Sequence, residues 1–121
     1  MARGGKKSYS RSARVGETLR EIIAEELVRI DDERLGFVSV TGIDVDPELN
    51  RAHVFYDSLT GEDGDDEILE ALAEHRVRIQ SSIARQIRAK KTPILDFQPD
   101  PAIRSASRID DILRADRGRR D

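Results

Sequence analysis

The chain has 121 residues, the size of one domain with a modest core, and charged residues make up 37% of it. It contains no cysteine, which excludes disulfides, thiolate catalysis and cysteine-based metal sites. No apolar run approaches the roughly 18 residues that a membrane span needs. The basic, Gly/Ser-rich start also lacks the apolar segment of a secretory signal. We therefore expect a soluble, cytoplasmic protein that does not bind a membrane.

The first part of the chain predicts a basic arm followed by a helix. Residues 1–11 carry basic side chains without one acid, so we expect them to be a disordered arm. Ser12 is suited to cap a helix that continues to about Ile30. Apolar residues at steps of three and four predict its buried stripe, which consists of Val15, Leu19, Ile22 or Ile23, Leu27 and Ile30.

Two strands are predicted next. The first runs over residues 37–45, and its apolar alternation changes phase at Gly42, which predicts a β-bulge. Residues 46–50 have the composition of a turn, with Pro47 in a favourable position. The second strand covers residues 51–58 and places one set of apolar side chains on a single face, namely Ala52, Val54 and Tyr56.

A long helix is predicted after an acidic loop at residues 61–66. It spans about residues 66–91 and ends before Pro93. A straight helix would align one apolar face and would place Arg76 in the middle of it. We predict a kink at residues 75–77 that removes this conflict, and the alternative is that Arg76 extends past the edge of the core. The apolar residues of that face are Leu69, Leu72, Ile79, Ile83 and Ile87.

A third strand at residues 94–97 and a short helix at residues 108–113 complete the predicted elements. The order α-β-β-α-(kink)-α-β predicts an α+β fold, in which a three-stranded mixed sheet carries helices on one face. We divide the chain into a disordered basic arm (1–11), a folded domain (12–115) and a flexible C-terminal tail (116–121).

Charge is separated into two consecutive blocks, of which the second lies in the long helix. Residues 57–74 contain eight acids and no base, whereas residues 75–91 contain six basic residues and no acid. Exposed helix faces usually mix both signs, so an unmixed basic block indicates a surface for a polyanion such as nucleic acid. The alternative is that the basic block is only a solvent-exposed helix face without a binding role. The candidate RNA-binding residues are Lys6, Lys7, Arg11, Arg14, Arg76, Arg78, Ser81, Arg85, Arg88, Lys90 and Lys91.

Catalytic motifs are missing from the sequence. There is no nucleophile elbow, phosphate-binding loop or dinucleotide fingerprint, and the acidic loop lacks the ligand spacing of a calcium site. The one Gly-x-x-Gly sequence, residues 61–64, is acidic and would repel a phosphate. We predict a protein that is not an enzyme, with no catalytic residues, no metal, no cofactor and no small-molecule substrate. His53 is interpreted as structural or solvent-facing, and His75 as a helix residue or an RNA contact.

The ordered motifs between residues 11 and 115 resemble the ribosome-binding factor A family, whose fold is similar to a type II KH domain. Four segments carry the resemblance. They are Arg14-Val15, the stretch from Asp32 to Thr41, the hairpin from Val45 to Tyr56, and the closing stretch Thr92–Phe97 with Asp100 and Arg108–Leu113. The family replaces the phosphate-gripping loop of KH domains with an Ala-x-Gly kink. His75-Arg76-Val77 occupies that place here without the alanine or the glycine.

The resemblance implies a bacterial assembly factor that binds 16S rRNA of immature 30S subunits near the decoding region. Its role would be to assist late maturation, including processing of the 16S rRNA 5′ end. With few aromatic residues for base stacking, recognition is expected to rest on phosphate contacts and shape. The alternatives are a general nucleic-acid-binding KH-like module and a protein-interaction adaptor that uses residues 57–74. We expect a monomer, because the apolar stripes and one sheet face account for the apolar residues.

Overall fold

The structure is a computed structural model that describes residues 11–87 and 92–120. The first ten residues, which form most of the predicted arm, and residues 88–91 therefore lie outside it. The proposed division at residues 11 and 115 stays a prediction. The elements, in chain order, are α2 (Arg11–Arg29), η1 (Glu33–Leu35), β1 (Val38–Val45), β2 (Arg51–Ser58), η2 (Gly61–Gly64), α3 (Asp65–Gln86), β3 (Ile94–Pro99) and α4 (Pro101–Arg120).

The three strands form one mixed sheet in the order β1-β2-β3. The pair β1–β2 is antiparallel and the pair β2–β3 is parallel, which requires the crossover that α3 provides. The register shifts between Val40 and Gly42, so the predicted β-bulge is confirmed, and Thr41 is its extra residue. The α+β class and the mixed sheet are therefore as predicted.

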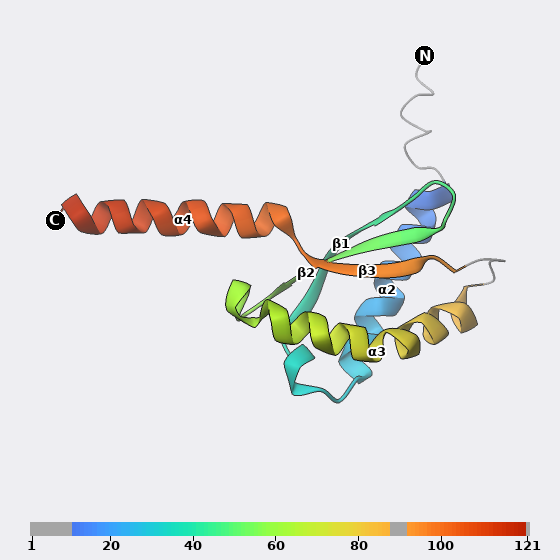
Figure 1. Cartoon of the computed structure of the whole chain (residues 1–121). Helices are drawn as coiled ribbons and strands as arrows, with labels where there is room; N and C mark the ends of the chain where they lie inside the picture. The colour runs from blue at the N-terminus through green and yellow to red at the C-terminus, as the bar shows by residue number, and fades with distance from the viewer. Residues whose placement is uncertain (1–10, 88–91, 121) are drawn as a thin grey trace, which may run out of the picture.

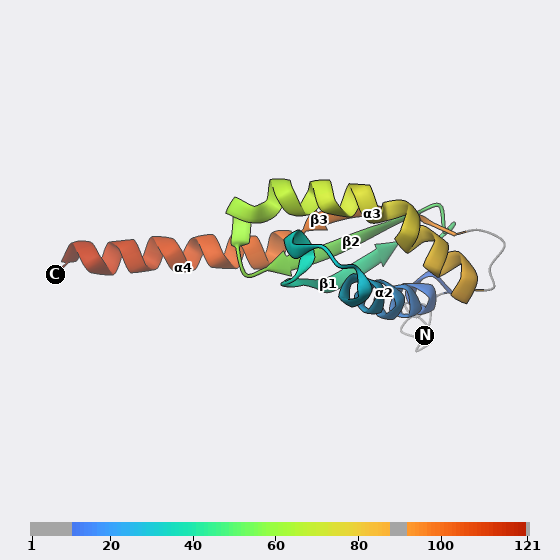
Figure 2. The ribbon, with the colours of Figure 1, turned by 90° about the horizontal axis from the view of Figure 1, so that it is seen from below.

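Helices α2 and α3 cover the same face of the sheet (Figures 1 and 2). The predicted stripe of α2 is confirmed, since Leu19 and Ile23 are fully buried and Val15 is packed at the edge. Gly16 lets α2 pack closely on β1, because a Cβ there would stand 3.3 Å from Cγ2 of Ile43, which is a tight contact. The inward side chains of β2 belong to the same core cluster as buried residues of both helices. Those side chains of β2 are Ala52, Val54 and Tyr56.

Helix α3 buries a stripe that overlaps the predicted one, since Leu72, Ile79 and Ile83 are buried and Leu69 and Ile87 are packed at the edge of the core. The buried side chains share a single helical phase, in which His75 rather than Arg76 occupies the middle. Arg76 is exposed, so the conflict that motivated the kink does not arise. The helix is continuous through residues 75–77, and its axis nevertheless bends near the middle (Figure 2). The buried stripe is Ile68, Ala71, Leu72, Ile79, Ser82 and Ile83.

Helix α4 is longer than predicted. It begins at Pro101 and ends at Arg120, whereas the sequence pattern indicated only residues 108–113. Asp100 caps it, because Oδ1 of Asp100 accepts a hydrogen bond from the backbone N–H of Ala102 at 3.0 Å. Proline is favoured at the first helical position. The helix projects away from the rest of the molecule (Figure 1).

Candidate nucleic-acid interface

The basic half of α3 presents two arginines without an ionic partner. Arg76 and Arg85 are exposed, and neither forms an ion pair within the described residues. Arg78 differs, because its Nε lies 3.4 Å from Oε2 of the buried Glu26 in α2. Part of the Arg78 guanidinium therefore balances a buried carboxylate, which would be costly to leave unpaired. Arg76 and Arg85 are the better placed to neutralise phosphate.

The start of α2 lies at the same end of the molecule as the end of α3 (Figures 1 and 2). Arg11 and Arg14 are exposed there. The structure thus places Arg11 and Arg14 at the same end as Arg85, near the end of α3. Arg76 and Arg78 lie nearer the middle of α3, and Arg78 contacts Glu26 in the last part of α2. The remaining candidates, Lys6, Lys7, Arg88, Lys90 and Lys91, lie outside the described residues.

A surface hollow of about 390 Å³ lies between α3 and the start of β3. Arg76 and Ser81 line it together with two apolar side chains, Val77 and Ile94, which are 76% and 46% exposed. Exposed apolar groups beside an arginine and a hydroxyl can contact a base or ribose while the charge binds phosphate. The predicted residues Arg76 and Ser81 therefore share one concave surface.

Gln80 fixes the geometry of this hollow, a role that sequence reasoning missed. Its Nε2 donates to the carbonyl oxygen of Pro93 at 3.1 Å, and its Oε1 accepts from the backbone N–H of Leu95 at 2.9 Å. These two bonds hold the start of β3 against α3. A glutamine in a basic helix gives no signal for this role, because its partners lie 13 and 15 residues further along the chain.

The two serines in the basic half of α3 have different environments. Ser81 is exposed and lines the hollow, whereas Ser82 is buried in the core face of the helix. Oγ of Ser82 accepts a hydrogen bond from Nε2 of Gln86 at 3.0 Å. Ser82 is therefore a packing residue, and only Ser81 can reach a phosphate.

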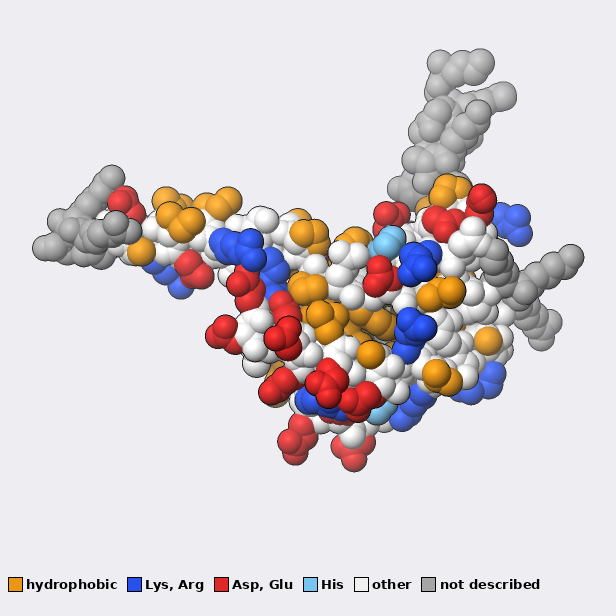
Figure 3. Space-filling model, viewed as in Figure 1, with side chains coloured by type: hydrophobic (Ala, Val, Ile, Leu, Met, Phe, Trp, Pro, Cys, Tyr) orange, Lys and Arg blue, Asp and Glu red, His pale blue; other side chains and the backbone are white. Residues whose placement is uncertain are grey.

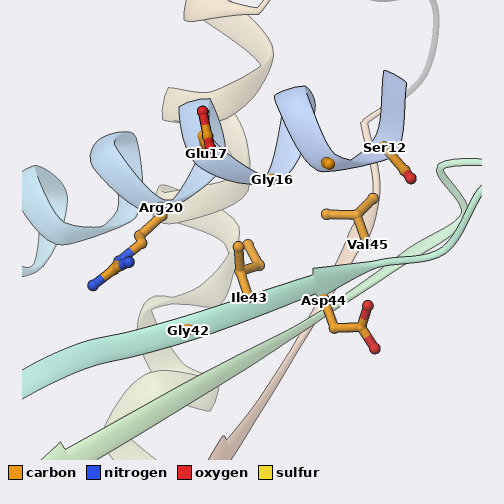
Figure 4. A pocket seen from close by; sticks show the side chains of 9 residues that line it. Ser12, Gly16, Glu17, Arg20, Gly42, Ile43, Asp44 and Val45 are labelled. Atoms are coloured by element: carbon orange, nitrogen blue, oxygen red, sulfur yellow. The ribbon is translucent and has the colours of Figure 1, made fainter. Parts of the chain in front are cut away.

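A second hollow, of about 430 Å³, lies between the first half of α2 and β1 (Figure 4). Small residues line part of this hollow and leave space there. Ile43 and Val45 point towards the helix, whereas Asp44 points away from it. Its charged lining mixes Arg20 with Glu17 and Asp44. This mixture suits a polyanion less well than the basic half of α3.

The acids at the other end of α3 are held by arginines from distant segments. Arg34 donates to Asp32 at 2.7 Å and to Glu74 at 2.8 Å, and these bonds lower the pKa of both carboxyl groups. Arg104 of α4 pairs with Asp65, and Arg108 pairs with Glu62. Acidic side chains gather at the lower left in Figure 3, over the start of α3, away from the basic end.

Arg104 is the buried member of this group. It is 7% exposed, lies 6.0 Å from the centre of the Tyr56 ring, and shares Asp65 with the Tyr56 hydroxyl, which donates at 2.9 Å. The Asp65 carboxylate raises the pKa of Arg104, and burial with Asp65 nearby raises the pKa of Tyr56. Arg104 therefore anchors the base of α4 to the start of α3.

Both histidines have carboxylate partners. Nε2 of His75 donates to Oδ2 of Asp32 at 2.9 Å, so His75 links α3 to the turn before η1. His53 lies 3.1 Å from Asp96 across β2 and β3, on the sheet face opposite the helices. The structural interpretation of His53 agrees with this contact.

The Gly-x-x-Gly sequence forms the short helix η2. Gly61 has a φ of 61°, and a Cβ on Gly64 would stand only 2.0 Å from Oγ1 of Thr60. These glycines are needed for the turn itself. No group of three or more potential metal-binding side chains occurs in the described part of the chain. Within those residues no helix is both long and apolar enough to cross a membrane.

Comparison with known proteins matches this chain to one family. The family model for ribosome-binding factor A matches residues 11–113. Ribosome-binding factor A of Rubrobacter xylanophilus is 41% identical in an alignment of 108 residues, and the match covers 88% of each chain. The protein of the same name from Azoarcus sp. is 38% identical in an alignment of 116 residues, and the match covers 91% of each chain.

Solved structures agree. The crystal structure of ribosome-binding factor A from Thermus thermophilus is 26% identical with a TM-score of 0.66, covering 73% of this chain and 93% of that one. A homology model of the T. thermophilus factor, fitted into the cryo-EM map of a 30S–RbfA complex, is 27% identical with a TM-score of 0.59, covering 71% and 91%. The sequence resemblance is therefore confirmed, and the chain belongs to the ribosome-binding factor A family.

Proposed function

We propose that this protein is a ribosome assembly factor that binds 16S rRNA of immature 30S subunits through the basic end of α3 and α2. The observation that carries the proposal is that Arg76 and Arg85 of α3 form no ion pair within the described residues, and that Arg76 lines a hollow with exposed apolar side chains. Membership of a family named for ribosome binding supports it, as does the relative fitted into a 30S complex.

Binding would begin with neutralisation of phosphates. Each arginine can grip a phosphate with two parallel hydrogen bonds, and each contact releases counterions from the RNA. Ser81 can donate a further hydrogen bond, and the hollow beside Val77 can accept a sugar or base. The described aromatic side chains are buried or partly buried except Phe37, which lies outside this surface. Shape and phosphate spacing would therefore carry specificity.

The acidic end would orient the protein on the subunit. Phosphates repel the carboxylates at the start of α3, while the arginines at its other end attract them. An approach with the wrong end forward is thereby disfavoured. The net charge of -3 also limits binding to nucleic acid elsewhere on the surface.

Maturation would be assisted without catalysis. A protein that holds folded 16S rRNA near the decoding region can favour the conformation in which nucleases process the 5′ end. We propose that role for this chain, as a monomer acting on free small subunits in the cytoplasm. The RNA conformation is then the product of binding energy, so no catalytic side chain is required.

Sedimentation tests the proposal. Tagged protein in bacterial lysate is expected to migrate with free small subunits and not with complete ribosomes, and its depletion is expected to leave 16S rRNA with an unprocessed 5′ end. Purified subunits and duplex DNA of equal phosphate concentration then separate a specific factor from a general nucleic-acid binder. Equal affinity for DNA and for subunits would refute the specific role.

A further inference from the structure

Two large apolar side chains lie exposed together at the acidic end of the molecule. Phe37 is 72% exposed and Leu59 is 80% exposed. The antiparallel ladder of β1 and β2 ends with Val38 opposite Ser58. Phe37 and Leu59 each lie one residue beyond that pair, and both line one hollow at the end of the sheet. Single exposed apolar residues are common, whereas two large ones that line the same hollow make that hollow a candidate contact surface.

The pair borders a hollow of about 130 Å³. Its other apolar lining comes from Val38 and from Ile68, which is buried in the core at the start of α3. The hollow therefore extends the hydrophobic core to the surface. An apolar side chain of a partner would be enclosed there between Phe37 and Leu59 and lose its contact with water.

The charge at the rim of this hollow is negative. Glu33 and Glu67 line it, and neither forms an ion pair within the described residues. Arg34 also lines the hollow, but its guanidinium is already bound to Asp32 and Glu74. A partner would therefore meet two available carboxylates and no available cation among the described lining residues.

We infer that this hollow is a docking site for a basic protein segment, which inserts one apolar side chain between Phe37 and Leu59 and places Lys or Arg against Glu33 and Glu67. Charge complementarity selects this occupant. Nucleic acid is disfavoured, because its phosphates would face carboxylates. The inference rests on the proposed function, since the segment is sought among the proteins of the small subunit, and it places a protein contact at the opposite end of α3 from the RNA contact.

Photo-crosslinking from Leu59 tests the inference. The photoreactive amino acid p-benzoyl-phenylalanine replaces Leu59, the protein is bound to purified small subunits, and crosslinks are identified by mass spectrometry. We expect a crosslink to a protein peptide in which an apolar residue neighbours Lys or Arg. Adding Glu33→Lys and Glu67→Lys is expected to reduce its yield about fivefold or more. Crosslinks to rRNA, to a second copy of the chain, or to nothing would overturn the inference.

A probe at Val77 serves as the matched control. Val77 is 76% exposed and lines the hollow beside Arg76, so this probe is expected to capture rRNA. Capture of rRNA from Val77 without protein capture from Leu59 would refute the docking site and leave the proposed function intact. A protein that neither crosslinks from Val77 nor sediments with subunits would refute the proposed function as well. Circular dichroism checks that each probe variant is folded.

Discussion

The two halves of α3 carry opposite charges and use them differently. In the first half, Asp65 and Glu74 are bound by Arg104 and Arg34, which lie 39 and 40 residues away along the chain. In the second half, Arg76 and Arg85 are exposed without an ion pair in the described residues. The acidic half thus assembles the fold, and the basic half leaves its charge available for a ligand. Charge counts along the sequence do not separate these roles, because they do not show which charges are already paired.

The largest effect is expected from a substitution that removes an ionic contact of the acidic half of α3. Arg104→Ala would leave the partly buried carboxylate of Asp65 without its cation, and we expect it to destabilise the protein by about 2–4 kcal/mol. Urea unfolding followed by circular dichroism measures this. Arg108→Ala removes a pair that is more than half exposed and should cost less than about 1 kcal/mol. Similar losses for the two variants would refute the anchoring role of Arg104.

Reversing the charge of the basic half of α3 should weaken binding without affecting the fold. Arg76→Glu combined with Arg85→Glu is expected to weaken binding to small subunits by about ten- to a hundredfold at moderate salt, because attraction is replaced by repulsion. Arg114→Glu combined with Arg117→Glu changes the net charge equally on the exposed part of α4. If this control lost as much affinity, the effect would belong to net charge and not to the end of α3.

The salt dependence of binding to small subunits measures how many phosphate contacts the protein makes. Four to six phosphate contacts would give a slope of log affinity against log salt of roughly -3 to -5, at about 0.7 to 0.9 per contact. Neutralising both arginines, as Arg76→Gln with Arg85→Gln, should reduce the slope by about 1.4 to 1.8. An unchanged slope would mean that neither arginine touches a phosphate.

Low pH should weaken the ionic contacts of the acidic half of α3 and leave the basic half unaffected. The pKa of Asp32 is lowered in the folded protein, chiefly by its hydrogen bonds from Arg34, and that of Glu74 is lowered by the same arginine. A lowered pKa stabilises the fold above the usual values of 3.8 and 4.5, and this contribution is lost as the pH falls below them. The urea midpoints of wild type and Asp32→Asn should therefore converge between pH 5 and strongly acidic pH. Arg85→Ala should show no such convergence.

The sheet could be predicted almost residue by residue, because its signals are local. The alternation of Ala52, Val54 and Tyr56 defines β2, and the phase change at Gly42 marks the bulge. The basic surface was visible as a block of unmixed charge. Asp100-Pro101 was also a local signal, a capping residue followed by a proline suited to the first helical position, and it could have located the start of α4.

The interactions that complete the fold are not local, which is why the sequence did not reveal them. His75 lies in the middle of the stripe of α3, where Asp32, 43 residues earlier, accepts its hydrogen bond. Gln80 holds β3, and Arg104 reaches Asp65 across 39 residues. A helical wheel describes spacing along one helix and contains no information about such partners.

The bulge in β1 has a consequence for the length that this strand can have. Oγ1 of Thr41, the extra residue, donates to Oδ2 of Asp100 at 2.6 Å, and that carboxylate also caps α4. Deleting Thr41 would remove this link at the same time as it shifted the register of β1. One residue thus joins the phase of the first strand to the direction of the last helix. Insertions and deletions at this point would be far less tolerated than the exposed position of an edge strand suggests.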